Sequence, residues 1–135
     1  MNEAIALTHV QDLGEVLEAR DGAFLAWDLV DEREVRIEKF RFPPGWKPQR
    51  ANIIFDLPVD YPQTQPTVYI QGDLQWQGER PHTMYPPKLH GEERLARYCI
   101  HELGWDPSTD DLVSMLDTLE ISLQDPTKRR IVEYD

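Results

Sequence analysis

The chain has few cysteines, few basic residues and no long apolar run, and each shortage excludes a class of protein. Its 135 residues include one cysteine, Cys99, so no disulfide can form within the chain. No window approaches the ~18 apolar residues that a membrane-spanning helix needs. The start, MNEAIALTHVQD, lacks the basic flank and apolar stretch of a signal peptide. We therefore expect a cytoplasmic protein without a membrane partner.

The scarcity of positive charge points away from nucleic acid. Lys and Arg number 14 against 25 Asp and Glu, which gives a formal net charge of −11. Such a field repels nucleic acid and anionic lipid and attracts basic partners. The chain also lacks a glycine-rich phosphate loop and a paired-cysteine zinc motif, so no cofactor or metal is expected. Its length fits a single domain over residues 1–135.

The first half of the chain carries a helical and then an alternating pattern. HVQDLGEVLEAR, residues 9–20, places its apolar residues on one helical face. AFLAWDLV and EVRIEKFRF alternate like the two strands of a hairpin, and Phe40 and Phe42 break the phase as a bulge in the second strand would. RANIIFDL and PTVYIQ continue the alternation. These segments predict a helix followed by a four-stranded antiparallel meander.

The second half begins without a clear period and ends in a helix. Residues 72–97 are rich in proline and charge, which predicts a long irregular segment. A helix is expected from Asp110 to Gln124, capped by Ser108 or Thr109, and Pro126 marks its end. Its apolar residues recur at helical spacing and are expected to cover one face of the sheet: Leu112, Met115, Leu116, Leu119 and Leu123.

Two sequence motifs, taken together with the order of the predicted elements, indicate a protein family. FDLPVDYPQTQPTVYI, residues 55–70, has a tyrosine-proline turn and a further proline between two strands, and CIHELGWDP, residues 99–107, joins the cysteine to a Trp-x-Pro. With the element order, they resemble the ubiquitin-conjugating enzyme family over residues 8–126. The resemblance implies an α+β, UBC-like fold with an N-terminal helix, a four-stranded antiparallel meander, a cysteine-bearing irregular segment and a covering helix.

The chain departs from the family pattern in ways that resemble its short prokaryotic branch. The His-Pro-Asn tripeptide ahead of the cysteine has no counterpart, since the only asparagines are Asn2 and Asn52, and the two extra C-terminal helices of eukaryotic members are not expected, because few residues follow the covering helix. The resemblance implies that Cys99 accepts a ubiquitin-like protein as a thioester from a ThiF-like activating enzyme and transfers it to a target amine. It also implies a JAB-type deconjugating protease as a partner. The first helix, with Glu15 and Glu18, would meet the activating enzyme.

The residues around Cys99 suggest roles in that chemistry. Only a thiolate attacks, and nearby positive charge raises the thiolate fraction. If residues 97–101 are extended, Arg97, Cys99 and His101 share one side. His101 would orient or deprotonate the nucleophile. In other family members the asparagine of the His-Pro-Asn tripeptide contacts the oxyanion, and here His90 or His82 would make that contact instead. Trp105 and Pro107 would pack the cysteine loop against the last helix.

Three alternatives to this interpretation stay open at the level of sequence. Cys99 could be a buried cysteine with a histidine at the surface. It could instead join His82, His90 and His101 around a tetrahedral zinc, although their spacings match no familiar finger. The chain could also be a non-catalytic UBC/RWD-like interaction scaffold, which the cysteine at the matching position argues against.

Overall fold

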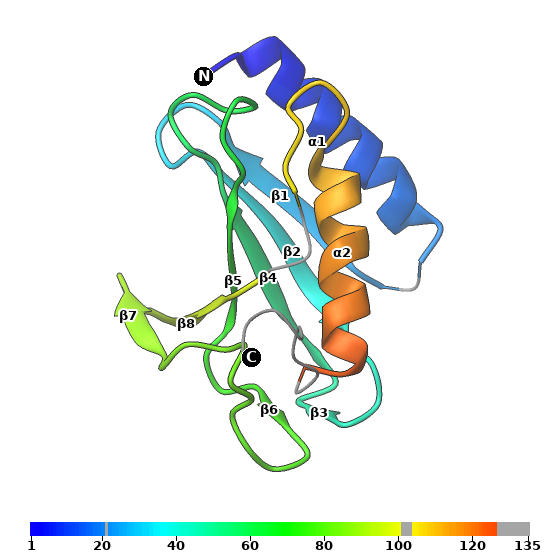
Figure 1. The fold of residues 1–135 in the computed structure, drawn as a ribbon, viewed down its shortest axis with the longest axis vertical. Coiled ribbons are helices and arrows are strands. Elements are labelled where there is room, and N and C mark those ends of the chain that lie inside the picture. Colours follow the sequence, from blue (N-terminus) through cyan, green and yellow to red (C-terminus); the bar gives the residue numbers. More distant parts are fainter. Residues whose placement is uncertain (21, 101–103, 127–135) are drawn as a thin grey trace.

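A computed structural model of the protein describes residues 1–20, 22–100 and 104–126. It is an α+β fold in which two helices pack on an antiparallel sheet (Figure 1). The elements in chain order are α1 Glu3–Glu18, β1 Phe24–Asp28, β2 Glu34–Arg41, β3 Trp46–Lys47, β4 Arg50–Asp56, β5 Thr67–Gln71, β6 Gln75–Trp76, β7 Lys88–His90, β8 Glu93–Tyr98 and α2 Leu112–Gln124.

Both predicted helices are present. α1 begins earlier than expected because the Asn2 side chain caps it, accepting a hydrogen bond of 3.1 Å from the Ile5 amide. α2 buries all five of the apolar residues that its spacing predicted. Its cap is Asp111, which forms a capping box with Ser114, and not Ser108 or Thr109. Within the described residues, no helix combines the length and the apolar character needed to cross a membrane.

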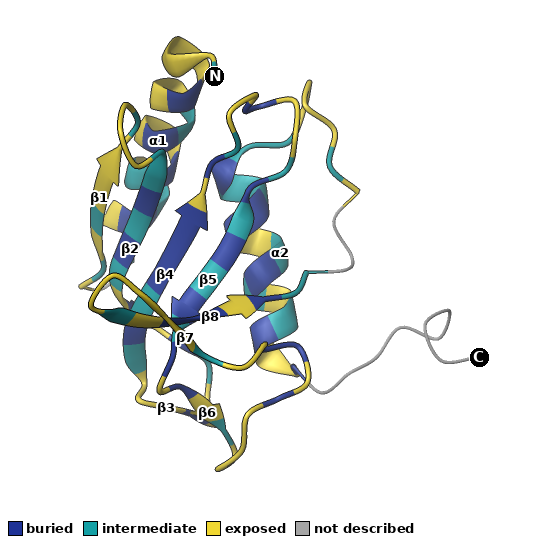
Figure 2. Cartoon of the chain, turned by 90° about the vertical axis from the view of Figure 1, so that its left-hand side faces the viewer, coloured by how far each residue is buried: buried dark blue, intermediate teal, exposed yellow. Residues whose placement is uncertain are grey.

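The main sheet has six strands in the order β1-β2-β4-β5-β8-β7, and all neighbours are antiparallel. The predicted four-strand meander is its first part, and the register of β2 shifts between Ile37 and Phe40, which confirms the predicted bulge. α1 and α2 lie on the same side of the sheet, behind it in Figure 2, and the core fills the space between. In the described part of the chain no helix covers the other face of the sheet, which we call the open face.

The expectation of an irregular segment over residues 72–97 is correct only in part, because residues 77–87 lie outside helices and strands but the residues on either side of them do not. The stretch 72–97 contains β6, which pairs with β3, and the hairpin of β7 and β8, which extends the sheet beyond β5. The hairpin turns at Gly91, whose φ of 67° lies in the left-handed region that glycine adopts readily. Cys99 therefore follows a regular strand.

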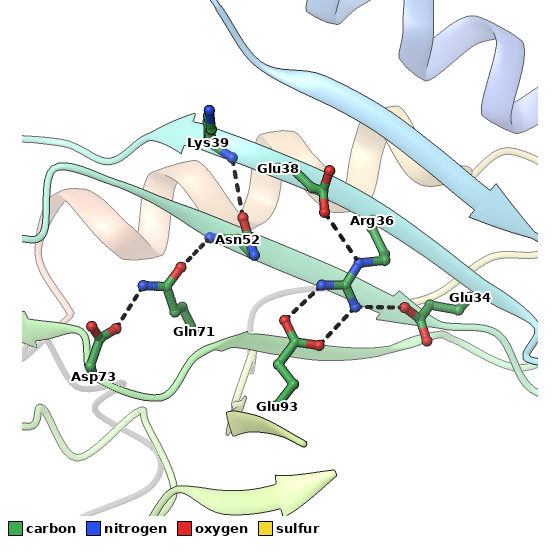
Figure 3. A network of polar contacts seen from close by, with 8 residues as sticks. All are labelled: Glu34, Arg36, Glu38, Lys39, Asn52, Gln71, Asp73 and Glu93. Carbon is green, nitrogen blue, oxygen red and sulfur yellow. Dashed lines mark hydrogen bonds and ion pairs between the residues drawn. The ribbon is translucent and has the colours of Figure 1, made fainter. Parts of the chain in front are cut away.

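A polar clamp holds this hairpin over the open face (Figure 3). Arg36 on β2 donates two hydrogen bonds to Glu93 at the start of β8, at 2.9 and 2.6 Å, and a third to Glu34 at 2.8 Å. The hydrogen bonds from Arg36 lower the pKa of Glu93, and those to Glu93 raise the pKa of Arg36. Because β4 and β5 lie between β2 and β8, the clamp joins strands that are not neighbours.

Candidate functional site

Cys99 lies directly after β8, where the chain leaves the sheet. Val68 on β5 is opposite Tyr98, so the cysteine emerges beside the start of β5. It is partly buried and lines an open surface pocket of about 260 Å³. Residues 65–68 and 97–100 form the walls of this pocket, which we call the Cys99 pocket. Cys99 thus borders a pocket that is open to solvent.

A second segment runs along the other side of the cysteine. The Cys99 amide donates to the Thr83 carbonyl at 2.8 Å, and the Tyr85 amide donates to the Arg97 carbonyl at 2.9 Å. Met84 and Tyr98 form the bridge between these two bonds. Residues 83–85 therefore pair with residues 97–99 as a short antiparallel ladder. The backbone of Cys99 is held from the side opposite β5.

Arg97 lines the pocket together with its neighbours Tyr98, Cys99 and Ile100. Its guanidinium carbon lies 5.5 Å from the centroid of the Tyr85 ring, a distance typical of a cation–π contact. This contact holds a permanent positive charge beside the ladder that carries Cys99. Such a charge favours the thiolate over the thiol.

Of the three histidines predicted at the site, the structure places His82 and His90. His82 is exposed and directly precedes Thr83, so it lies next to the ladder that holds Cys99. His101, expected to orient the nucleophile, lies outside the described residues. His90 pairs with Glu93 at the opposite end of β8, and its ring contacts Tyr69 at a centroid distance of 4.9 Å.

His90 therefore does not contribute to the Cys99 pocket, contrary to the expected oxyanion contact. It lines another pocket, on the open face, together with the carboxylates of Glu34, Asp56 and Glu93. The turn of the β7–β8 hairpin carries it there, which the sequence did not reveal. Among residues 1–20, 22–100 and 104–126, no three His, Cys, Asp or Glu side chains gather closely enough to hold a metal ion.

Trp105 is anchored differently from the expectation. Its indole Nε1 donates to the Pro62 carbonyl at 2.8 Å, and its ring lies 6.1 Å from the Tyr61 ring. It therefore packs on the tyrosine-proline turn, and Pro107 is exposed. The two sequence motifs meet in space, although they are far apart in the chain.

Tyr61 connects this turn to the first helix. Its side chain is fully buried, and its hydroxyl lies 2.6 Å from His9 Nδ1 on α1. Burial raises the pKa of Tyr61, so the phenol stays neutral. α1, the tyrosine-proline turn and the chain that follows the cysteine segment thus form one connected unit.

Sequence reasoning missed Thr83. It is buried, with 5% of its surface exposed, and its carbonyl accepts the Cys99 amide. A threonine in a proline-rich stretch gives no periodic signal of burial. Only the pairing of residues 83–85 with 97–99 reveals its position.

Comparison with known protein families identifies the family of this chain. Residues 15–126 match the model of the family described as "Prokaryotic E2 family E". No curated protein and no solved structure matches the chain significantly. The match covers most of the chain, including both motifs, the cysteine and α2. The chain therefore belongs to prokaryotic E2 family E, an E2-like family of the UBC-like type.

Proposed function

We propose that this E2-like protein carries a ubiquitin-like protein as a thioester on Cys99 and transfers it to an amine of a target. The observation that carries the proposal is the position of Cys99. The only thiol of the chain lies at the end of β8, in an open pocket with Arg97 on its wall, in a chain of the E2 family. A thiol used only for packing needs no such pocket.

The chemistry would proceed in two exchanges. The Cys99 thiolate attacks the carbonyl of the thioester on the activating enzyme, whose thiolate leaves as the new thioester forms. A target amine then attacks this thioester, the amide bond forms, and the Cys99 thiolate leaves. The amine loses a proton to a base, the role for which the sequence suggested His101. The positive charge of Arg97 favours the thiolate as nucleophile and as leaving group.

Two partners follow from this proposal: a ubiquitin-like protein and its activating enzyme, which the resemblance makes ThiF-like. Glu15 and Glu18 are exposed on α1, so the helix presents negative charge to solvent. Opposite charge on a partner accelerates association by steering. We expect the activating enzyme to approach this helix with a basic surface.

The test is a loading assay with the cognate activating enzyme, ATP and the ubiquitin-like protein. The wild-type chain should gain a covalent adduct that excess thiol removes. Cys99→Ser should give an adduct that resists thiol, if the weaker hydroxyl nucleophile loads, and Cys99→Ala should give none at this site.

A thiol-sensitive adduct on Cys99→Ala would exclude the assignment, because the chain has no second cysteine. If the wild-type chain binds both cognate partners and no adduct forms, the protein is a scaffold of the same fold. Ser108→Ala, at an exposed residue after the Trp-x-Pro, is a control that should load normally.

A further inference from the structure

Thr83 combines two properties that rarely occur together. Its side chain is 95% buried, since 5% is exposed, and its hydroxyl has no hydrogen-bond partner. In the part of the chain that the structure describes, one other buried side-chain polar atom shares this state, the indole nitrogen of Trp76. A buried hydroxyl without a partner costs free energy, so it calls for an explanation.

The backbone register directs Thr83 toward the cysteine. Met84 is opposite Tyr98, so Thr83 is opposite Cys99, and the Cys99 amide donates to the Thr83 carbonyl. Opposite residues of an antiparallel pair project to the same side of the sheet, with their Cβ atoms ~5 Å apart. The next opposite pair, Tyr85 and Arg97, shows this directly, because their side chains are in contact.

We infer that the Thr83 hydroxyl is the hydrogen-bond donor that stabilises the thiolate of Cys99. In the structure the hydroxyl forms no hydrogen bond to the thiol sulfur. A thiol sulfur accepts hydrogen bonds weakly, whereas a thiolate is a charged acceptor and forms a much stronger bond. The hydroxyl keeps its own proton throughout, and the thiol proton passes to solvent. The inference deepens the proposed function and rests on it.

The burial of Thr83 indicates that its hydroxyl bonds the Cys99 sulfur and not an incoming substrate. An incoming thioester or amine approaches through the pocket, and the threonine oxygen is closed to solvent. The sulfur of Cys99, by contrast, belongs to the residue directly opposite in the ladder. Thr83 therefore assists thiol ionisation before the substrate carbonyl arrives.

Several charged or polar groups lie near Cys99. Arg97 lies on the same segment, His82 directly precedes the ladder and Tyr85 belongs to it, and the pocket wall formed by residues 65–68 carries no charged side chain. A comparison between variants at residue 83 leaves all of these in place. The effect of the hydroxyl can then be separated from theirs.

The test measures the rate of alkylation of the purified chain by iodoacetamide as a function of pH. Because Cys99 is the only cysteine, this rate reports its thiolate fraction alone. Thr83→Val keeps the shape and removes the hydroxyl. We expect its midpoint to rise by about one pH unit, a tenfold loss of thiolate well below the midpoint. Thr83→Ser should keep the wild-type midpoint.

Two further measurements distinguish this role from a structural one. Thr83→Val removes a hydroxyl without a partner, so its urea midpoint should equal or exceed that of wild type while its thiol is less acidic. Loading should be slower by the same factor at neutral pH and recover at high pH. If Thr83→Val does not fold, Thr83→Ala serves in its place, and Thr8→Val on α1 is the matched control.

An unchanged alkylation midpoint in folded Thr83→Val would overturn the inference. So would a shift caused by Thr67→Val, across the pocket on β5, with none from Thr83→Val. The alkylation assay needs no partner protein. A shifted midpoint without any loading would therefore count against the proposed function alone, and normal loading with an unshifted midpoint against Thr83 alone.

Discussion

Replacing Tyr61 by phenylalanine should destabilise the protein near neutral pH but not at alkaline pH. At pH 8 the variant loses the hydrogen bond between the hydroxyl and His9 Nδ1, which is 2.6 Å long. A net loss of about 1 kcal/mol in the free energy of unfolding is expected for one such bond. The ring itself remains, so its packing against Trp105 is kept.

The alkaline effect follows from the raised pKa of Tyr61, whose cause is burial. In the unfolded chain a tyrosine ionises at a pKa of about 10, whereas in the folded chain Tyr61 stays protonated. Its stabilising contribution is therefore complete below pH 10 and is lost as the pH rises above that value. At pH 11 the loss amounts to about 1.4 kcal/mol relative to pH 9. Tyr61→Phe has no such loss, so the two proteins should become equally stable near pH 11.

The measurement is urea unfolding of both proteins at several pH values between 8 and 11. Tyr85→Phe is the matched control, since the Tyr85 ring is exposed, and it should retain the alkaline loss of the wild type. The reasoning fails if Tyr61→Phe loses as much stability as the wild type between pH 9 and pH 11. In that case the turn opens to solvent before Tyr61 ionises.

Two further predictions concern the contacts that hold the site. Glu93→Gln should lower the free energy of unfolding by about 1 kcal/mol at pH 7, because a partly exposed ion pair contributes little more and Arg36 keeps Glu34 as a partner. The pKa of Glu93 is lowered, so its contribution is present above about pH 4.3 and lost as the pH falls through the lower folded value. Urea curves at pH 7 and pH 3 should show the difference shrink, with the exposed Glu92→Gln as control; an equal difference at both values would mean that charge is not its cause. Trp46→Phe should cost about 2 kcal/mol or more, because the buried Leu123 carbonyl then lacks the indole donor at 2.8 Å. Trp27→Phe, at an exposed ring, should change the free energy by less than about 0.5 kcal/mol, and an equal effect of both changes would contradict the burial argument.

The elements that could be predicted from the sequence are those whose burial follows a regular period. α2 buries one face, and β2 alternates in burial apart from the bulge, whereas β4 alternates only up to Ile53, after which Ile54 and Phe55 are also buried. β7 is exposed throughout, and in β8 the neighbours Leu95 and Ala96 are both buried, so neither strand shows a period of two. The sequence feature that still indicated the β7–β8 hairpin was Gly91, a turn-forming residue between two short segments.

For the candidate site, only the nearness of residues close together in the chain could be predicted from the sequence. Arg97 and Cys99 belong to one short segment, so their nearness follows from the chain itself, and Tyr98 and Ile100 of the same segment also line the pocket. The positions of Thr83, His90 and Trp105 depend on the β7–β8 hairpin and on the tyrosine-proline turn. These bring together residues far apart in the chain, which spacing along one segment cannot show.

The contact between His9 and Tyr61 bears on where the protein can be shortened. The family match begins at residue 15, within α1, yet the buried Ala6, Val10 and Leu13 lie before it. A version trimmed to the matched region would expose the core beneath these side chains and leave the Tyr61 hydroxyl without its histidine. The unit that folds is therefore longer than the unit that the family model matches, and truncations intended for expression or crystallisation should retain the helix from Asn2 onward.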